Sequence, residues 1–277
     1  MVSETAIPAS EASASLDAPA RSFLWRKLFS LTGVVPVGTF VLFHLWENAK
    51  ALQGREAYGK MVNDIATLPF ITVLEVVLIL APMLFHAVLG LKFVLDARYN
   101  VGTYGYSRNW MFVLQRVTGV AALGFIGYHL YELRWQKLLG TMDGAGFYDD
   151  LCRNLSSTFG PVPLIALVYL LGIGAVAFHF ANGLWGFLFS WGITPTRRSQ
   201  RIAGTVLGVV GLLVFVLGAN TTIYFATGSK LFIPSEIGAN KSATPDNCPA
   251  SVAFPAPTEP ASPEAQPPST PKPEPSP

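Results

Sequence analysis

The sequence predicts an all-α integral membrane protein, a bundle of five transmembrane helices whose first four helices form an internal two-fold repeat. Three observations support this fold class. The 277 residues are 51% hydrophobic and only 13% charged, whereas a soluble domain carries about twice that share of charge. The apolar residues gather into blocks long enough to cross a bilayer, for which a helix needs roughly 20 residues. Two pairs of these blocks share short motifs in the same order.

Five blocks qualify as membrane spans on length and hydropathy. We expect the spans at residues 28–49, 68–95, 110–135, 162–191 and 202–227. The third is the weakest because Arg116 lies inside it. The fifth contains Gly204, Gly208 and Gly211, a spacing that either allows close helix approach or reflects simple backbone permissiveness.

Residues 22–228 form the predicted membrane domain, and the segments on either side differ from it. Residues 1–21 are small, polar and acidic, lack the features of a cleavable signal peptide, and predict a disordered cytoplasmic leader. Residues 229–277 are rich in Pro, Ala, Ser and Glu and predict a disordered outer tail. Cys152 and Cys248, both expected on the outer side, either form a disulfide or remain free thiols.

Basic residues are concentrated on the connections of one side. Ten of the 19 Lys and Arg residues lie before span one, around the link between spans two and three, or between spans four and five. Because cytoplasmic connections carry the excess of positive charge, we expect the N-terminus in the cytoplasm and the C-terminus outside a bacterial inner membrane. We expect membrane lipid around the bundle and no nucleic-acid partner.

The four histidines all lie in the spans, one in each of the first four, at equivalent points of the repeat. Spans one and three each have Thr-Gly, at 32–33 and 118–119, followed by HLWE at 44–47 or HLYE at 129–132. Spans two and four share Phe-His-xxx-Gly-Leu around His86 and His179. Polar groups inside a membrane are costly and usually functional, so we interpret the four histidines as ligands rather than as simple interhelical hydrogen-bond partners.

Depth along the helices pairs these histidines. At about 1.5 Å rise per residue, His44 and His129 lie roughly 24 and 28 Å from the cytoplasmic ends of their spans, and His86 and His179 roughly 14 and 18 Å. His44 should therefore pair with His129 near the outer face, and His86 with His179 nearer the inner face. Two such pairs are what two b-type haems require as axial ligands. A zinc ion would need further ligands, and we expect no Asp, Glu or Cys at either depth.

Other residues in the spans would complete two haem sites. Ser30, Thr32, Lys92 and Arg116 are candidate donors to propionates on the cytoplasmic side, although Lys92 and Arg116 could instead extend to the membrane interface. Glycines would make room for the flat macrocycles, namely Gly33, Gly38, Gly90, Gly119, Gly124, Gly172, Gly174 and Gly183. With both axial positions filled, the iron would pass electrons but would have no vacant position for a substrate.

Three stretches of the chain resemble a known family. GREAYGKMVNDIATLPF, LILAPMLFHAVLGL and FHFANGLWGFLFSWGI are similar to cytochrome b558 subunits of succinate dehydrogenase, which are five-helix di-haem anchors also similar to the cytochrome b of some fumarate reductases. The likeness covers roughly residues 22–228. It implies the same histidine pairs and a subunit without a succinate site of its own. It also implies a flavoprotein subunit and an iron–sulfur subunit docked on the cytoplasmic face, with electrons passing through two haems b to quinone, menaquinone being the expected one.

Quinone chemistry also moves protons and therefore needs protonatable groups. Glu75 is the only carboxylate well inside a predicted span, where it either carries protons for the quinone or is structural. We interpret Glu47, Asp64 and Glu132 as solvated helix ends at the outer interface. Fumarate reductases of this type are expected to have a Glu two residues before the fourth-span histidine. This chain has Ala177 there, which favours succinate oxidation.

Two alternative functions remain open at this point. The cytochrome b subunit of a hydrogenase or formate dehydrogenase would dock its partner on the outer face, opposite to the basic connections. A proton-coupled transporter with intramembrane histidines would need polar cavities and broken helices. Apart from Pro82, the spans are short of both features.

Overall fold

A computed structural model describes residues 22–140 and 146–231, and these ranges are helical apart from loops and one isolated bridge between Phe159 and Val162. Five helices are long and apolar enough to cross a membrane: Ser22–Gln53, Ile71–Leu95, Ser107–Leu138, Leu164–Ser190 and Arg197–Thr227. The prediction of five membrane-spanning helices is therefore confirmed. The predicted leader, Cys248 and the tail from residue 232 onward lie outside the described residues.

Three of the spans change helix type along their length, as the following bounds show. Span one contains η1 (Gly33–Gly38), α2 (Thr39–Asn48) and η2 (Ala49–Gln53); span two contains α4 (Ile71–Leu74), η3 (Glu75–Leu80) and α5 (Ala81–Leu95); span three contains α6 (Ser107–His129), η4 (Leu130–Trp135) and α7 (Gln136–Leu138). Spans four and five are the single helices α9 (Leu164–Ser190) and α10 (Arg197–Thr227). Proline, which has no N–H to donate, explains two of the three π-helical turns, because Pro36 lies inside η1 and Pro82 follows η3.

Local sequence moves several helix ends away from the predicted limits. Span two begins at Ile71 rather than at residue 68, because Pro69 disfavours helical backbone in the residue before it. Phe70 then takes a left-handed conformation with φ 58°. Span five begins five residues earlier than predicted, because Thr196 and Ser199 form a capping box before the apolar block starts.

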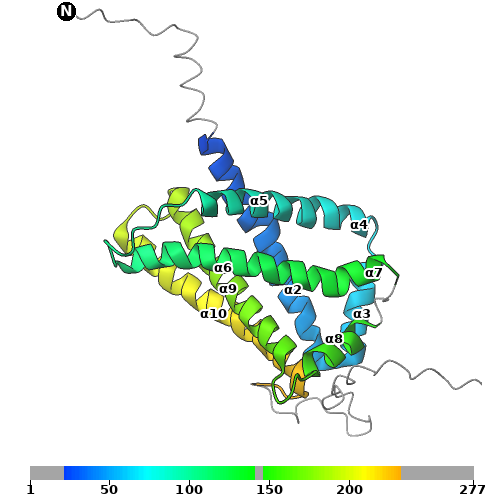
Figure 1. Ribbon diagram of the computed structural model, residues 1–277. Coiled ribbons are helices and arrows are strands. Elements are labelled where there is room, and N and C mark those ends of the chain that lie inside the picture. Colours follow the sequence, from blue (N-terminus) through cyan, green and yellow to red (C-terminus); the bar gives the residue numbers. More distant parts are fainter. Residues whose placement is uncertain (1–21, 141–145, 232–277) are drawn as a thin grey trace, which may run out of the picture.

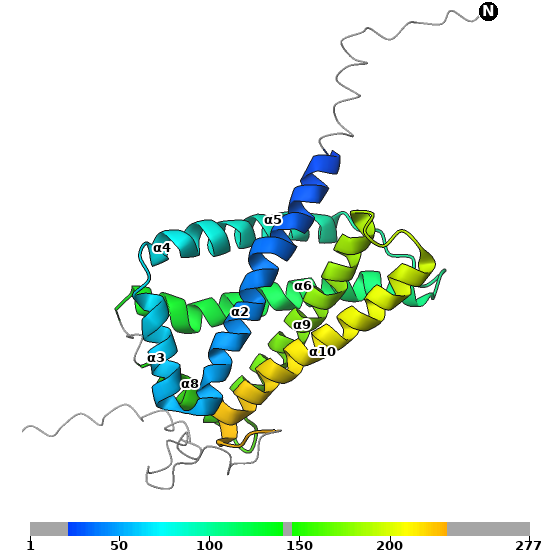
Figure 2. The ribbon, with the colours of Figure 1, turned by 180° about the vertical axis from the view of Figure 1, so that it is seen from behind.

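Helices α9 and α10 form the most extensively packed pair, and α6 also packs along α9. Figures 1 and 2 show α9 and α10 side by side, while span one crosses α5 and α6 in both views. The close approach of α10 to α9 occurs at Gly211, where a Cβ would lie 2.7 Å from Cβ of Ala181. Gly208 faces nothing within 4 Å. Close packing of α10 on α9 therefore depends on Gly211 and on Gly218, where a Cβ would lie 2.7 Å from Cγ2 of Ile173, rather than on the Gly204–Gly208 spacing.

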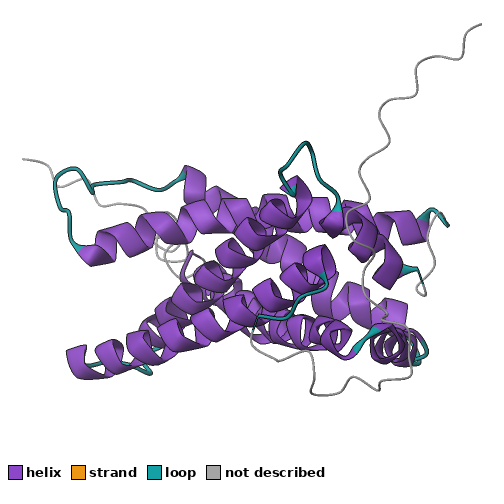
Figure 3. Cartoon of the chain, turned by 90° about the horizontal axis from the view of Figure 1, so that it is seen from below, coloured by secondary structure: helices purple, strands orange, loops and turns teal. Residues whose placement is uncertain are grey.

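Two short helices that the sequence analysis missed close one end of the bundle. These are α3 (Arg55–Ala66) and α8 (Phe147–Ser156), which pack with the C-terminal end of α10 around Tyr58, Tyr148 and Phe225. Cys152 is buried in this cluster. Of the two alternatives for this residue, a disulfide and a free thiol, the free thiol is wrong because Cys152 is disulfide-bonded; Cys248 lies outside the described residues. Figure 3 shows the helices of the chain joined by loops, with no strand drawn in the described part of the chain.

Span two has the least protein around it. None of its residues is buried, and Val73, Val77, Leu84 and Val88 are well exposed. An apolar helix with such a surface suits a lipid environment, because its exposed apolar side chains are favourable in contact with lipid chains and unfavourable in contact with water.

Candidate functional site

The four histidines meet two by two inside the bundle. The rings of His44 on α2 and His129 at the end of α6 have their centroids 5.8 Å apart. The rings of His86 on α5 and His179 on α9 have theirs 6.3 Å apart. We call these the His44 pair and the His86 pair. They are the same two pairs that depth along the helices predicts.

The spacing of each pair suits one metal centre held between two imidazoles. Metal–nitrogen bonds of about 2 Å on both sides, with half a ring beyond each nitrogen, put the two centroids about 6 Å apart. The described residues contain no group of three or more His, Cys, Asp or Glu side chains that could hold a metal ion. Each site therefore offers two imidazole nitrogens, a donor set that would fit the iron of a haem, whose other four ligands would come from the porphyrin.

The rings of the His86 pair are fixed by backbone carbonyls. Nδ1 of His86 lies 2.9 Å from the oxygen of Phe29, and Nδ1 of His179 lies 3.0 Å from the oxygen of Gln115. A carbonyl can only accept a hydrogen bond, so these two contacts place the proton on Nδ1 and leave the lone pair of Nε2 for a metal. The side-chain nitrogen of Gln115 also lies 3.1 Å from Nδ1 of His179. Such hydrogen bonds orient metal-binding histidines and make them more basic.

Two glycines of the repeat give these rings their space. A Cβ on Gly119 would lie 2.8 Å from Cε1 of His179, and a Cβ on Gly33 would overlap Cε1 of His86. Each glycine stands four residues after the residue whose carbonyl receives the Nδ1 hydrogen bond. The Thr-Gly motifs thus lie at equivalent contacts in the two halves of the chain. The sequence analysis expected Gly33 and Gly119 to make room for macrocycles, whereas here they make room for the imidazoles.

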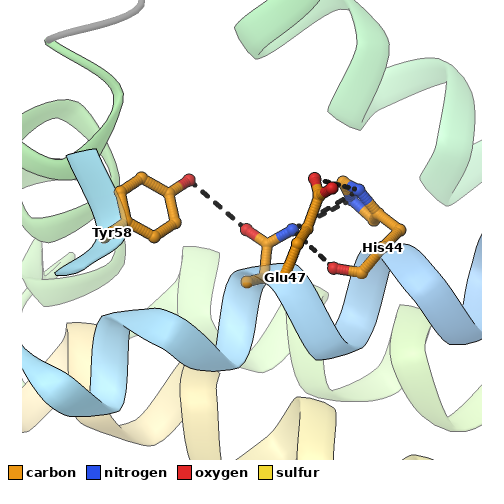
Figure 4. A network of polar contacts seen from close by, with 4 residues as sticks. His44, Glu47 and Tyr58 are labelled. Atoms are coloured by element: carbon orange, nitrogen blue, oxygen red, sulfur yellow. Dashed lines mark hydrogen bonds and ion pairs between the residues drawn. The ribbon is translucent and has the colours of Figure 1, made fainter. Parts of the chain in front are cut away.

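The rings of the His44 pair are fixed by acidic groups instead. Nδ1 of His44 lies 3.1 Å from Oε1 of Glu47, one turn later on the same helix (Figure 4). Nδ1 of His129 lies 3.2 Å from the hydroxyl of Tyr169, which in turn donates to Oε2 of Glu132 at 2.6 Å. Because that hydroxyl gives its proton to Glu132, its oxygen accepts from His129. Carboxylates thus accompany the His44 pair as partners on the Nδ1 side of the rings, and none of the described ones joins the pair as a further metal ligand.

The surroundings of these carboxylates also differ from the prediction. Glu132 is partly buried and accepts a further hydrogen bond from Asn154 at 2.9 Å. Glu47 is partly buried beside Asn48, whose amide oxygen faces the hydroxyl of Tyr58 at 3.4 Å (Figure 4). Burial, and then the charge of Glu47, raise the pKa of Tyr58, so Tyr58 stays a proton donor. The interpretation of Glu47 and Glu132 as solvated helix ends is wrong, whereas Asp64 is exposed as expected.

Arg116 is the predicted propionate contact whose surroundings best fit an anion. Its Nε is buried and has no hydrogen-bond partner among the described residues. Its guanidinium carbon lies 3.3 Å over the ring of Phe112, and Nη1 donates to the backbone oxygen of Phe112 at 3.0 Å. Buried polar atoms are almost always paired, so an unpaired guanidinium N–H suits an acidic group such as a haem propionate.

The other three predicted propionate contacts have partners within the protein. Lys92 forms an exposed ion pair with Asp96 at 2.8 Å. Thr32 donates to the backbone oxygen of Leu28 at 2.9 Å. Ser30 accepts from Nε1 of Trp191 at 3.0 Å and lies 3.2 Å from the backbone oxygen of Lys27. Their role toward a propionate stays a prediction.

Glu75, the predicted proton carrier, is paired with a cation. Nη2 of Arg134 donates to Oε2 of Glu75 at 2.5 Å, and the two side chains are 28% and 30% exposed. This contact joins η3 of span two to η4 of span three. The sequence analysis did not anticipate Arg134 as a partner, because the two residues stand on different spans.

Comparison with known proteins gives the family. The family of succinate dehydrogenase/fumarate reductase transmembrane subunits matches residues 98–218. The succinate dehydrogenase cytochrome b558 subunit of Bacillus subtilis (strain 168) is 39% identical over 205 residues, which are 74% of this chain and 98% of that protein. The chain belongs to this family. The resemblance seen in the sequence is thus confirmed, and a succinate dehydrogenase/fumarate reductase transmembrane subunit is one part of an enzyme complex.

The sequence analysis missed the groups that hold the imidazole rings in this subunit. Gln115 and Tyr169 belong to no repeated motif, so no signal in one sequence could assign them. Glu47 and Glu132 did carry a signal, since both stand three residues after a histidine and therefore on the same helix face. That spacing indicates an ordered histidine–carboxylate contact rather than a solvated helix end.

Proposed function

We propose that this chain is the membrane cytochrome b of a succinate:quinone oxidoreductase, binding two haems b and relaying electrons between an iron–sulfur subunit and menaquinone. The observation that carries the proposal is the two histidine pairs, in which Nδ1 of each imidazole lies within hydrogen-bond distance of a protein oxygen. A b-type haem held by two imidazoles supplies one-electron transfer and offers no free position for oxygen or substrate.

The spacing of the two sites supports a relay along the bundle. Gly119, against which His179 lies, and His129 are ten residues apart on α6, which corresponds to roughly 15 Å along the helix. Gly33, against which His86 lies, and His44 are eleven residues apart on span one, a similar separation. This separation along the helices is larger than the depth difference of about 10 Å that distances from the span ends predict. The two histidine pairs are still adjacent sites in the bundle.

Partner subunits would dock at the end of the bundle next to the His86 pair. Lys27 donates to the backbone oxygen of Ser190 at 2.6 Å, and the guanidinium of Arg108 lies 3.4 Å over Trp185. The start of span one, the start of α6 and the end of α9 therefore lie at one end. These segments carry the basic residues that identify the cytoplasmic side. The proposal places the iron–sulfur and flavoprotein subunits there, and leaves the succinate site to the flavoprotein.

Ala177 supports succinate oxidation as the reaction of the complex. This residue is 3% exposed, and its backbone oxygen lies 3.4 Å from the position that a Cβ on Gly211 would take. Alanine at this position offers no carboxyl group for proton transfer, and the protein encloses it.

The histidine pairs are tested by spectroscopy of the purified complex. We expect two haems per chain and two low-spin b-type signals in reduced-minus-oxidised spectra. His86→Ala and His179→Ala should each remove one and the same signal, while His44→Ala and His129→Ala should each remove the other. The proposal is overturned if the folded wild-type complex contains no haem, and the pairing is wrong if His44→Ala and His86→Ala abolish a common signal.

Glu75 is proposed to transfer protons to or from quinone, with Arg134 holding its carboxylate in place. Glu75→Gln should lower quinone turnover by about a hundredfold, as expected for loss of a general acid–base group, with both haem signals retained. Asp64→Asn, a neutral substitution of an exposed carboxylate on α3, is the control and should leave turnover unchanged. Unchanged turnover in Glu75→Gln would make the Glu75–Arg134 pair purely structural.

A further inference from the structure

The two histidine pairs differ in the chemistry of the groups that accept their Nδ1 hydrogen bonds. Both acceptors of the His86 pair are neutral backbone carbonyls, those of Phe29 and Gln115. Both acceptors of the His44 pair lead to a carboxylate, directly at Glu47 and through the Tyr169 hydroxyl at Glu132. The repeat thus supplies equivalent histidines with unequal surroundings.

These two carboxylates are not neutralised by cations. Among the described residues, neither Glu47 nor Glu132 forms an ion pair with a Lys or Arg, in contrast to Glu75 with Arg134. Hydroxyl and amide groups hold Glu132 instead, through Tyr169 and Asn154. Their negative charge therefore acts on the imidazoles largely without compensation.

Such differences change how strongly a ligand stabilises oxidised iron. A carboxylate that accepts the Nδ1–H of a histidine increases the basicity of its Nε2, which favours the more highly charged ferric state. A backbone carbonyl does so less. The two carboxylates therefore lower the reduction potential at the His44 pair.

We infer that Glu47 and Glu132 are positioning residues that lower the reduction potential of iron bound by His44 and His129. This inference rests on the proposed function. The carboxylates act through the imidazoles, so both haems remain bound when either charge is removed, and only the potential of one of them changes.

Potentiometric titration of the purified whole complex, followed by its visible spectrum, tests the inference. Removing one carboxylate by Glu47→Gln should change the reduced-to-oxidised ratio of the His44-pair haem about tenfold at a fixed ambient potential, an upward shift of about 59 mV for a one-electron couple. The His86-pair haem should not move. Glu56→Gln removes an exposed carboxylate from nearby α3 and should shift neither haem.

A second variant keeps the test decisive if Glu47→Gln loses its haem. Tyr169→Phe breaks the link between His129 and Glu132 while both carboxylates remain, and it should also raise the potential at the His44 pair alone. Unmoved potentials in Tyr169→Phe, or equal shifts of both haems in Glu47→Gln and Glu56→Gln, would overturn the inference and leave the proposed function intact. A wild-type complex without haem would instead overturn the proposed function.

Discussion

Single residues determine where the imidazoles lie, and glycine does so by leaving space. At Gly119 and Gly33 the ring of a histidine from the next span occupies the volume of a missing side chain. The histidines themselves were predictable, because an ionisable group in a membrane span indicates function. The role of these two glycines was not predictable, because a single sequence does not show which imidazole ring lies against which backbone.

Substitution of Gly119 tests this use of space. A Cβ at position 119 would lie 2.8 Å from Cε1 of His179, closer than packed atoms tolerate, so the ring must move. We expect Gly119→Ala to lose most of the haem of the His86 pair while the His44-pair signal stays, as measured by difference spectra. Gly127→Ala on the same helix meets nothing within 4 Å and should retain both signals. Equal spectra of the two variants would contradict this role of Gly119.

At the scale of elements, hydropathy predicts the spans but not their ends or their neighbours. The five spans were predictable because long apolar blocks have one stable conformation in a bilayer. Helices α3 and α8 were not predicted, since their short amphipathic sequences give no hydropathy signal. The first residue of span two is determined by Pro69 and Phe70. This local effect cannot be seen in the hydropathy of the apolar run.

Helix α10 offers a direct test of close packing between elements. In Gly211→Leu the added side chain would overlap Ala181. We expect the free energy of unfolding to fall by about 1–3 kcal/mol, as in other overpacked cores. Thermal unfolding of the detergent-solubilised complex measures this cost. Gly208→Leu, one turn earlier on a face with nothing within 4 Å, is the matched control and should change little. A larger loss in Gly208→Leu would mean that α10 packs by another face.

At the scale of the whole molecule, the two ends of the bundle differ in composition. One end carries the basic segments joined by Lys27 and Arg108. The other is closed by α3, α8 and the aromatic side chains around Tyr148. The pairing of the histidines was predictable at this scale because helical rise fixes depth. The groups that hold the rings were not, because three of the four acceptors come from another span or from a residue outside the repeated motifs.

The predicted sidedness can be tested with reporter fusions. Alkaline phosphatase needs disulfides and is active only outside the cytoplasm. A fusion after Leu231, beyond the fifth span, should be active, and a fusion at Gly192, between spans four and five, should be inactive. Activity of the Gly192 fusion alone would invert the orientation and move the proposed docking face of the partner subunits to the other side of the membrane.

Span two, which buries none of its residues, gives the assembly of this protein a particular order. A helix so sparsely covered by its neighbours gains little from side-chain packing, and its polar attachments to other spans are His86 and the Glu75–Arg134 ion pair. On the proposed function, iron–porphyrin insertion fastens the first helical hairpin to the second, since each cofactor takes one ligand from each. Cells starved of porphyrin should therefore accumulate this chain as separable hairpins in which the second helix is the first to be cut by intramembrane proteases.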